Sequence, residues 1–375
     1  MRTTASFNLF PDAPSERAMA RARWLAREGR LKDAEAAYRE LLEQHADLKA
    51  GWAEYFELLR GQGRAAEALQ VAQAAQVTFP DSAFPLALVG AALVELEQFP
   101  EALATLERAV ERDPDLGLVW HELGVAAYRL NDKSRALLAL DRAFALEPHT
   151  DTLKLRGRIL REAGRYAAAE VAFEGAAQAA AHREQREEAE REVAATRRYA
   201  FYAHRRPDEL TPAERWFADT GTVVLSPGPG PLPPSDEVLV TALLELVQDR
   251  GWEFGQLIVA GPTLPCWAAL GEGIGAAPVG RAAFDLAAVP LVVAPRPLPA
   301  DATWAACAPQ VMLHDAGLVF VLEHPSDSSD GVAADVIGVL TDGGARRARI
   351  PDVAHAMSEA QHPGTRFASR RLARR

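Results

Sequence analysis

Cysteine is scarce in this chain, which holds only Cys266 and Cys307 among its 375 residues. Two thiols cannot build a disulfide framework, and no cluster of cysteine and histidine has the spacing of a zinc site. We therefore expect neither a disulfide scaffold nor a bound metal.

Long apolar segments are also missing. No uninterrupted apolar run reaches the length needed to cross a membrane. The first residues, MRTTASFNLFPDAPSER, lack the apolar core of a secretory signal. We expect a soluble, cytoplasmic protein without a membrane partner.

The chain has no excess of positive charge, since 41 Lys and Arg residues face 52 Asp and Glu residues and the net charge is −11. Binding of phosphate depends mainly on Lys and Arg, so this balance argues against a nucleic-acid partner. Only the last ten residues depart from it, with five arginines. We interpret residues 366–375 as a solvated basic tail, and residues 1–14 as an N-terminal extension.

What the chain does have is a repeat of about 34 residues, with units that start at Ser15, Lys49, Ala83, Gly117 and Thr150. Each unit has apolar residues at helical spacing, broken once by a short polar turn, which predicts a pair of antiparallel helices. A small residue recurs where the two helices cross, and a large residue follows it, except that Ala72 underfills this site in the second unit. Such hairpins bury their apolar faces only by stacking into a helical solenoid. The crossing residues are Ala34, Ala68, Ala102, Ala136 and Ala169.

The units resemble tetratricopeptide repeats. In the fourth unit the pattern residues are Trp120, Leu123, Gly124, Ala136, Leu140, Ala143 and Pro148, and in the second they are Trp52, Ala68, Ala75 and Pro80. The resemblance implies a protein-binding solenoid over residues 15–204, ended by a charged capping helix. The aromatic end of that helix (Tyr199, Phe201, Tyr202) is expected to dock on the fifth repeat or on the next domain.

The same resemblance implies that the first helix of each unit lines a concave groove. The groove is expected to have an apolar middle and basic ends, which suits an extended or helical peptide with apolar anchors and an acidic end. Its occupant is another protein or peptide, or the chain's own C-terminal domain. The candidate groove residues are Arg23, Arg27, Phe84, Leu118, His121, Tyr128, Arg129, Lys154, Arg158 and Arg161, with Glu57 and Leu88 beside them.

Proline and glycine become frequent after Arg205, which predicts a linker and first strand over residues 205–235. Short β-branched runs then alternate with helical stretches, and this alternation predicts an α/β domain with a mostly parallel sheet over residues 236–365. The expected strands cover 222–225, 257–260, 289–294, 318–322 and 336–340, and the expected helices 236–249 and 265–270.

Within this domain, VFVLEHPSDSSDG resembles the sugar-phosphate loop of type I phosphoribosyltransferases. The resemblance implies a ribose and phosphate site, but His324 replaces the second acidic residue and Asp327 stands near a threonine position. We therefore assign no catalytic residue and expect a degenerate domain that serves as scaffold or ligand sensor. The alternative is a phosphoribosyl-diphosphate-dependent transferase regulated by the repeats. The loop residues concerned are Glu323, Ser326, Ser328, Ser329 and Gly331.

Two weaker signals complete the sequence. Gly271, Gly273 and Gly275 have the spacing of a dinucleotide-binding turn, but they follow a helical stretch rather than a strand, so we expect no such cofactor. Cys266 stands near the start of that helix, and we expect a buried thiol rather than a nucleophile. The sequence thus favours a non-enzymatic adaptor.

Overall fold

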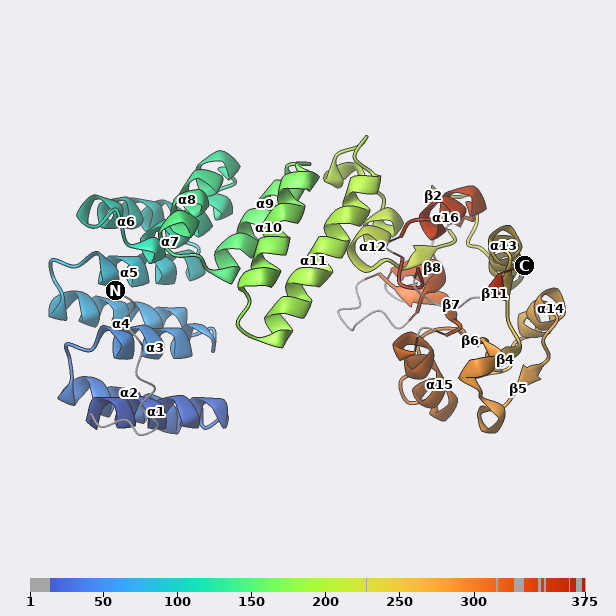
Figure 1. Ribbon diagram of the computed structural model, residues 1–375, viewed down its shortest axis with the longest axis horizontal. Coiled ribbons are helices and arrows are strands. Elements are labelled where there is room, and N and C mark those ends of the chain that lie inside the picture. Colours follow the sequence, from blue (N-terminus) through green and yellow to red (C-terminus); the bar gives the residue numbers. More distant parts are fainter. Residues whose placement is uncertain are drawn as a thin grey trace, which may run out of the picture. The chain divides into compact units, whose positions relative to one another are not determined.

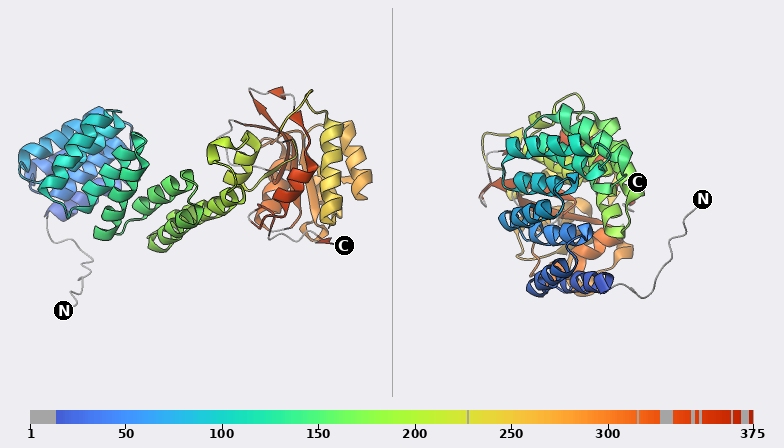
Figure 2. Two further views of the ribbon diagram at one scale, coloured as in Figure 1. Left: turned by 90° about the horizontal axis from the view of Figure 1, so that it is seen from above. Right: turned by 90° about the vertical axis from the view of Figure 1, so that its left-hand side faces the viewer.

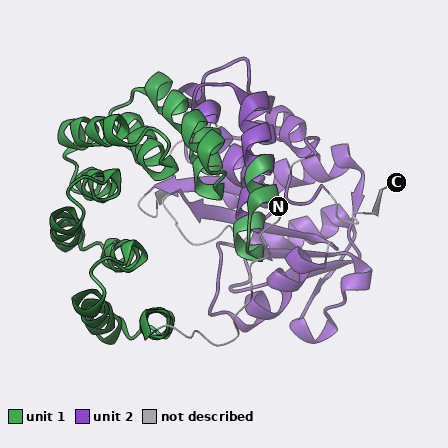
Figure 3. Ribbon diagram, turned by 60° about the vertical axis from the view of Figure 1, so that its left-hand side comes forward, with its two compact units in different colours: residues 1–159, 175–186 green, residues 160–174, 187–375 purple. Residues whose placement is uncertain are grey.

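The computed structural model describes residues 14–226, 228–314, 316–326, 334–342, 345–346, 349–363, 365–368 and 373–374. Two compact units are present (Figure 3). Unit 1 comprises residues 1–159 and 175–186, and unit 2 comprises residues 160–174 and 187–375. The division runs through the fifth repeat, so that this repeat contributes residues to both units. The domain boundaries expected from the sequence stay predictions.

Helices α1–α10 form five helical hairpins, and those of the first four repeats follow one another in sequence order (Figure 2, right). Every predicted unit and every predicted turn is confirmed. The pairs are α1 (Pro14–Arg27) with α2 (Leu31–Gln44), α3 (Lys49–Arg60) with α4 (Ala65–Thr78), α5 (Ala83–Glu95) with α6 (Phe99–Arg112), α7 (Gly117–Arg129) with α8 (Lys133–Leu146), and α9 (Thr150–Glu162) with α10 (Tyr166–Ala179).

The predicted crossing alanines are all fully buried. Opposite the large site of the third hairpin stands Gly90, where an added Cβ would lie 2.5 Å from Cγ of Leu106. Glycine at this position therefore lets the two helices approach. In the second hairpin the sizes are exchanged, because Phe56 occupies the glycine position and Ala72 the leucine position. Both are completely buried in one apolar cluster, where the large ring of Phe56 stands opposite the small Ala72.

Helix α11 (Arg183–Phe201) ends in aromatic residues that pack on α12 (Pro212–Thr220) and α16 (Val353–Ala360) within unit 2. Tyr202 is 1% exposed and its hydroxyl donates to Glu359. The Tyr199 hydroxyl donates to Oδ1 of Asp219 over 2.7 Å. Phe201 lies edge-on to Phe217, with ring centroids 6.3 Å apart. The predicted docking of this aromatic end is thereby confirmed. Its contacts include the following domain as well as Arg161 and Tyr166 of the fifth repeat.

Unit 2 also contains a sheet in which six described strands run parallel in the order β1-β8-β7-β6-β4-β5 (Figure 1). The predicted α/β class is confirmed, and all five expected strands are present. The order is β1 (Val223–Val224), β8 (Val336–Asp342), β7 (Leu318–Pro325), β6 (Pro290–Ala294), β4 (Gln256–Val259) and β5 (Pro278–Val279), with β9 (Ala345–Arg346) antiparallel to β8. Two antiparallel pairs stand apart: β2 (Gly228–Pro229) with β10 (Arg349–Ile350), and β3 (Trp252–Glu253) with β11 (Ala373–Arg374).

Side chains on the central strands alternate between two buried layers, which explains why these strands read as continuous apolar runs. Leu291 and Val293 face a layer that contains α13 (Asp236–Arg250), α14 (Pro265–Ile274) and α16. Val292 and Ala294 face a layer that contains α15 (Ala302–Leu313) and residues of α12. Short 3-10 turns occur at Pro207–Glu209, Arg281–Ala283 and Leu286–Ala288. The sheet is therefore covered by helices on both faces.

Helix boundaries in this domain follow their capping residues. Ser235 accepts a hydrogen bond from the backbone N–H of Val238 at the start of α13, and Gly251 ends the helix with a φ of 61°. Gly271 and Gly273 lie inside α14 and Gly275 caps it, which confirms that these glycines form no strand-to-helix turn. Cys266 is 2% exposed, and burial raises the pKa of its thiol to about 11. The expected inert, buried cysteine is confirmed.

Candidate functional site

A hollow of about 460 Å³ lies in unit 1 among the first helices of three repeats, and we call it the acidic pocket. Its walls come from α3, α7, the end of α8 and the segment that starts α9. It includes three residues singled out by their repeat position, namely Glu57, Leu118 and His121. The full lining is Glu57, Arg60, Gly117, Leu118, His121, Glu122, Ala143, Glu147, His149, Asp151 and Thr152.

The walls of the acidic pocket meet because α5, the first helix of the repeat between those of α3 and α7, has short side chains here. Helix α5 places Ala87 and Ala91 at the repeat positions that correspond to His121 and Glu57, and both alanines are buried. Because these side chains are short, Arg60 extends from α3 to α7, where its Nη1 lies 3.9 Å from Oε1 of Glu122. Arg60 also binds Glu57 one turn earlier, with Nη2 2.9 Å from Oε2.

Glu122 is the most unusual residue of the acidic pocket. The residue is only 5% exposed, and its ion-pair partner Arg60 lies 3.9 Å away, beyond hydrogen-bonding distance. Burial raises the pKa of its carboxyl to about 7, while the charge of Arg60 opposes this rise. Glu57 and Glu95 add to the rise through repulsion. A carboxyl that is mostly buried and paired only with a distant guanidinium is costly to ionise, and it is therefore a candidate ligand contact.

The pKa of His121 is shifted in the opposite direction, below its ordinary value. Burial lowers the pKa of its imidazole to about 4, and the neighbouring His149 adds to this effect. Its Nδ1 lies 3.0 Å from the hydroxyl of Thr152 at the start of α9. The imidazole is thus neutral at pH 7 and is held between two repeats.

These two shifts predict opposite dependences of stability on pH. In the variant Glu122→Gln the lowered pKa of His121 remains, so the free energy of unfolding falls as the pH drops from 6.5 towards 4 because the unfolded imidazole binds the proton. In the variant His121→Gln the raised pKa of Glu122 remains, so stability is highest below pH 4.5 and falls as the pH rises to 7. We expect each trend to amount to about 2 kcal/mol relative to the wild type. Urea unfolding at pH 4.5, 5.5 and 6.5 measures it, and parallel pH curves for both variants would contradict the assignment.

The other residues of the predicted groove lie outside the lining of the acidic pocket. Phe84 is half-buried against Phe79, with ring centroids 6.4 Å apart, whereas Leu88 is buried. Tyr128 is half-buried, and Arg27 and Arg158 are exposed. Several of the basic residues are engaged within the chain: Arg23 with Glu54, Arg129 over the ring of Phe99, Lys154 with Asp151, and Arg161 with Glu192 and the ring of Tyr199. The middle of the predicted groove is therefore more acidic than expected.

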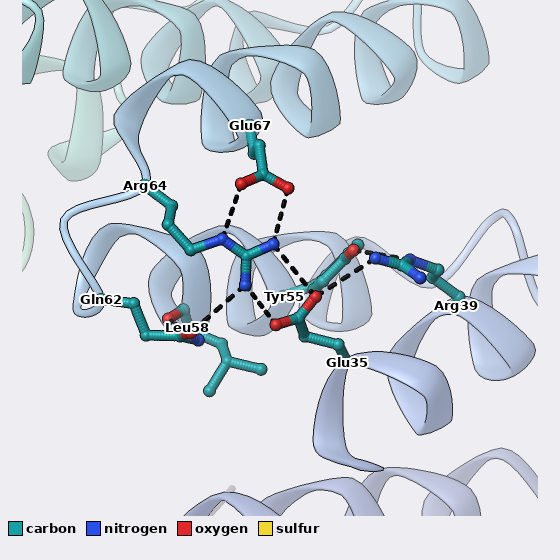
Figure 4. A network of polar contacts seen from close by, with 7 residues as sticks. All are labelled: Glu35, Arg39, Tyr55, Leu58, Gln62, Arg64 and Glu67. Atoms are coloured by element: carbon teal, nitrogen blue, oxygen red, sulfur yellow. Dashed lines mark hydrogen bonds and ion pairs between the residues drawn. The ribbon is translucent and has the colours of Figure 1, made fainter. Parts of the chain in front are cut away.

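A second hollow of about 410 Å³ lies among α2, α3 and α4 and includes Tyr55 and Glu67 in its lining. The polar contacts beside it are drawn in Figure 4. Arg64 binds the buried Glu35 of the preceding repeat and, through Nε over 2.7 Å, Oε1 of Glu67. Arg39 donates to the Tyr55 hydroxyl over 2.9 Å. These side chains hold neighbouring repeats together, which favours a structural role for this network.

In unit 2, two residues of the predicted sugar-phosphate loop are engaged with neighbouring segments. Glu323 lies within β7, and Nε of Arg346 donates to its Oε2 over 3.2 Å. The Ser326 hydroxyl donates to Oδ1 of Asp342 over 2.6 Å. Ser328, Ser329 and Gly331 lie outside the described residues.

A leucine lies beside the turn at the crevice where ligands enter many parallel sheets. The order in which strands are added changes direction between β4 and β6, and such switch points bind ligands at the carboxyl ends of the strands. Here Gly261 follows β4 with a φ of 76°, and an added Cβ would lie 2.4 Å from Cδ1 of Leu298. Leu298 therefore occupies the space beside this turn.

Arg346 allows a test of the structural role of Glu323. Its Nη2 lies 2.6 Å from Oδ1 of Asp236, and its Nη1 donates to the backbone oxygen of Pro234 over 3.0 Å. The variant Arg346→Met leaves two carboxylates without this partner, and we expect a loss of about 1–2 kcal/mol in urea unfolding because the site is partly exposed. The matched variant Arg250→Met, which removes an ion pair with the adjacent Asp249, should change little. Equal stability of both variants would contradict this role.

No family model and no curated protein matches the sequence. Similar solved structures include TTC0263, a thermophilic tetratricopeptide protein of Thermus thermophilus, with 16% identity, a TM-score of 0.42 and coverage of 48% of this chain and 98% of that one. YrrB, described as a tetratricopeptide protein with an unusual peptide-binding site, has 20% identity, a TM-score of 0.31 and coverage of 46% and 90%. PilW, a type IV pilus biogenesis factor, has 18% identity, a TM-score of 0.40 and coverage of 52% and 91%.

The N-terminal region is a series of helical hairpins, as the repeat pattern predicted. The alanines at the helix crossings of all five hairpins are buried. Among the described residues, no helix is long and apolar enough to cross a membrane, and no group of three or more His, Cys, Asp or Glu side chains is placed to hold a metal ion.

Proposed function

We propose that this chain is a non-enzymatic adaptor whose repeats bind a segment of another protein along the face that α3, α7 and α9 share. The acidic pocket is the observation that carries the proposal. Its walls come from separate repeats, so a ligand there contacts several hairpins at once, as expected of a recognition surface on a solenoid. A volume of about 460 Å³ is also within the usual range of binding sites.

The α/β domain serves as a scaffold in this proposal. Glu323 and Ser326 are engaged by Arg346 and Asp342, and Leu298 fills the space beside the turn after β4. These contacts support a structural role for the domain more than a transferase activity. Cytoplasmic localisation stays a prediction from the sequence.

Selection of 12-residue peptides by display on the full chain tests the proposed binding. We expect enriched peptides with micromolar affinity, and we expect Leu118→Trp to weaken them by at least about tenfold because the indole fills the acidic pocket. Leu138→Trp on α8 is the matched control, since Leu138 is 73% exposed and does not line the pocket. The proposal fails if no peptide is enriched, or if both variants bind the selected peptides like the wild type.

A further inference from the structure

We propose that the acidic pocket receives a lysine or arginine side chain of the bound segment. This inference rests on the proposed function and specifies its partner, because it replaces the acidic peptide end expected from the sequence with a basic anchor. Three features of the pocket support it: its charge, its buried carboxyl and its lining.

The charge of the lining favours a cation. Four acidic residues, Glu57, Glu122, Glu147 and Asp151, line the hollow together with the guanidinium of Arg60. Arg60 pairs with Glu57 and Lys154 pairs with Asp151, so the excess of acidic groups in the lining comes from Glu122 and Glu147. A carboxylate ligand would also face the remaining acidic side chains, and repulsion between like charges is strong where water is partly excluded.

The carboxyl of Glu122 has room for a closer cationic partner. Its ion-pair partner Arg60 has its Nη1 3.9 Å away, beyond hydrogen-bonding distance. An ammonium or guanidinium group donates charge-assisted hydrogen bonds to a carboxylate, and these are roughly twice as strong as hydrogen bonds between neutral groups. A basic ligand would thus add a direct hydrogen bond to a carboxyl that Arg60 contacts only at this distance.

The lining of the site offers contacts for both the stem and the charged end of such a side chain. Leu118 and Ala143 provide apolar walls for the methylene groups, and Glu147 and Asp151 lie in the same lining. Lysine and arginine pack their stems on apolar surface while their heads reach polar groups. His121 is held by Thr152 and is neutral, so it does not repel the cation.

Four pools of random seven-residue peptides, identical except for arginine, lysine, glutamate or leucine at the centre, test the inference on an array probed with the full chain. We expect the arginine and lysine pools to retain at least about tenfold more protein than the other two. Preference for the glutamate or leucine pool would overturn this inference and leave the proposed function standing. Retention by none of the pools would overturn both.

Two variants locate the preference. Glu122→Gln keeps the shape of the side chain but removes its charge, and we expect the ratio of basic to leucine retention to fall by at least about fivefold. Glu101→Gln, on the exposed surface of α6, is the matched control and should keep the wild-type ratio. Circular dichroism confirms that both variants are folded. An unchanged ratio in folded Glu122→Gln would contradict the assignment to this pocket.

Discussion

The variant Gly90→Phe should unfold the repeats at far lower urea concentrations than the wild type, with a loss of at least about 3 kcal/mol. The reason is the close approach of α5 and α6, where even a Cβ at this position would lie 2.5 Å from Cγ of Leu106. Circular dichroism during urea unfolding of the full chain measures the loss.

The second hairpin shows how the same site accepts a phenylalanine. There Phe56 and Ala72 occupy the positions of Gly90 and Leu106. We therefore expect Leu106→Ala alone to cost about 2–5 kcal/mol, and the double variant Gly90→Phe with Leu106→Ala to recover most of the loss. If the double variant loses as much stability as the two single variants together, the phenylalanine–alanine pair of the second hairpin cannot replace the glycine–leucine pair of the third.

A control glycine with more space separates packing from helix propensity. Gly175 lies in α10, and an added Cβ there would meet only Cδ1 of Leu153, at 3.2 Å. Gly175→Ala should be neutral or stabilising by up to about 1 kcal/mol, because alanine is the better helix former.

The variant Tyr202→Ala should destabilise unit 2 by about 3–5 kcal/mol, because it removes a buried ring and the hydrogen bond from Tyr202 to Glu359. The ring of Tyr202 lies 4.9 Å from Phe201 and 6.3 Å from Phe217, measured between centroids. Glu359 is 1% exposed and keeps a second contact, with its Oε1 3.0 Å from Nε2 of His355. Hydrogen exchange of β6 and β7 in urea follows the stability of this unit.

Comparing Tyr202→Phe with Tyr202→Ala separates the contribution of the hydroxyl from that of the ring. Tyr202→Phe keeps the ring and removes the hydroxyl, so it should cost about 1–3 kcal/mol, less than the alanine variant. If Tyr202→Ala costs less than about 1 kcal/mol, the end of α11 does not belong to the core of unit 2.

The repeat architecture was predictable because its signal is periodic. Alanine recurs at the helix crossings, and each crossing depends only on local spacing, so the helices begin and end close to the predicted positions. The compensating pair of Phe56 and Ala72 was not recognised, because the two residues belong to different helices and each is unremarkable alone. Aligning the repeats and comparing the residues at the glycine position with those at the leucine position would reveal this exchange of sizes.

The candidate site was less predictable. Glu122 corresponds to Leu88 of the preceding repeat, which the repeat pattern placed at the groove, but Glu122 itself was not named as a groove residue. The reach of Arg60 past α5 depends on Ala87 and Ala91, two short side chains in another repeat. Glu323 was interpreted as a ribose contact because its segment resembles a sugar-phosphate loop. Its contact with Arg346 was not foreseen, because Arg346 follows it by 23 residues and only the pairing of strands brings the two together.

Hydrogen exchange of the full chain, with and without a display-selected peptide, tests the central claim most directly. If the repeats bind their partner at the acidic pocket, the peptide should slow exchange in α3, α7 and the start of α9, while α4 and α6 keep their rates. Slower exchange confined to α2 and α4, or to the α/β domain, would place the binding surface elsewhere and contradict the account.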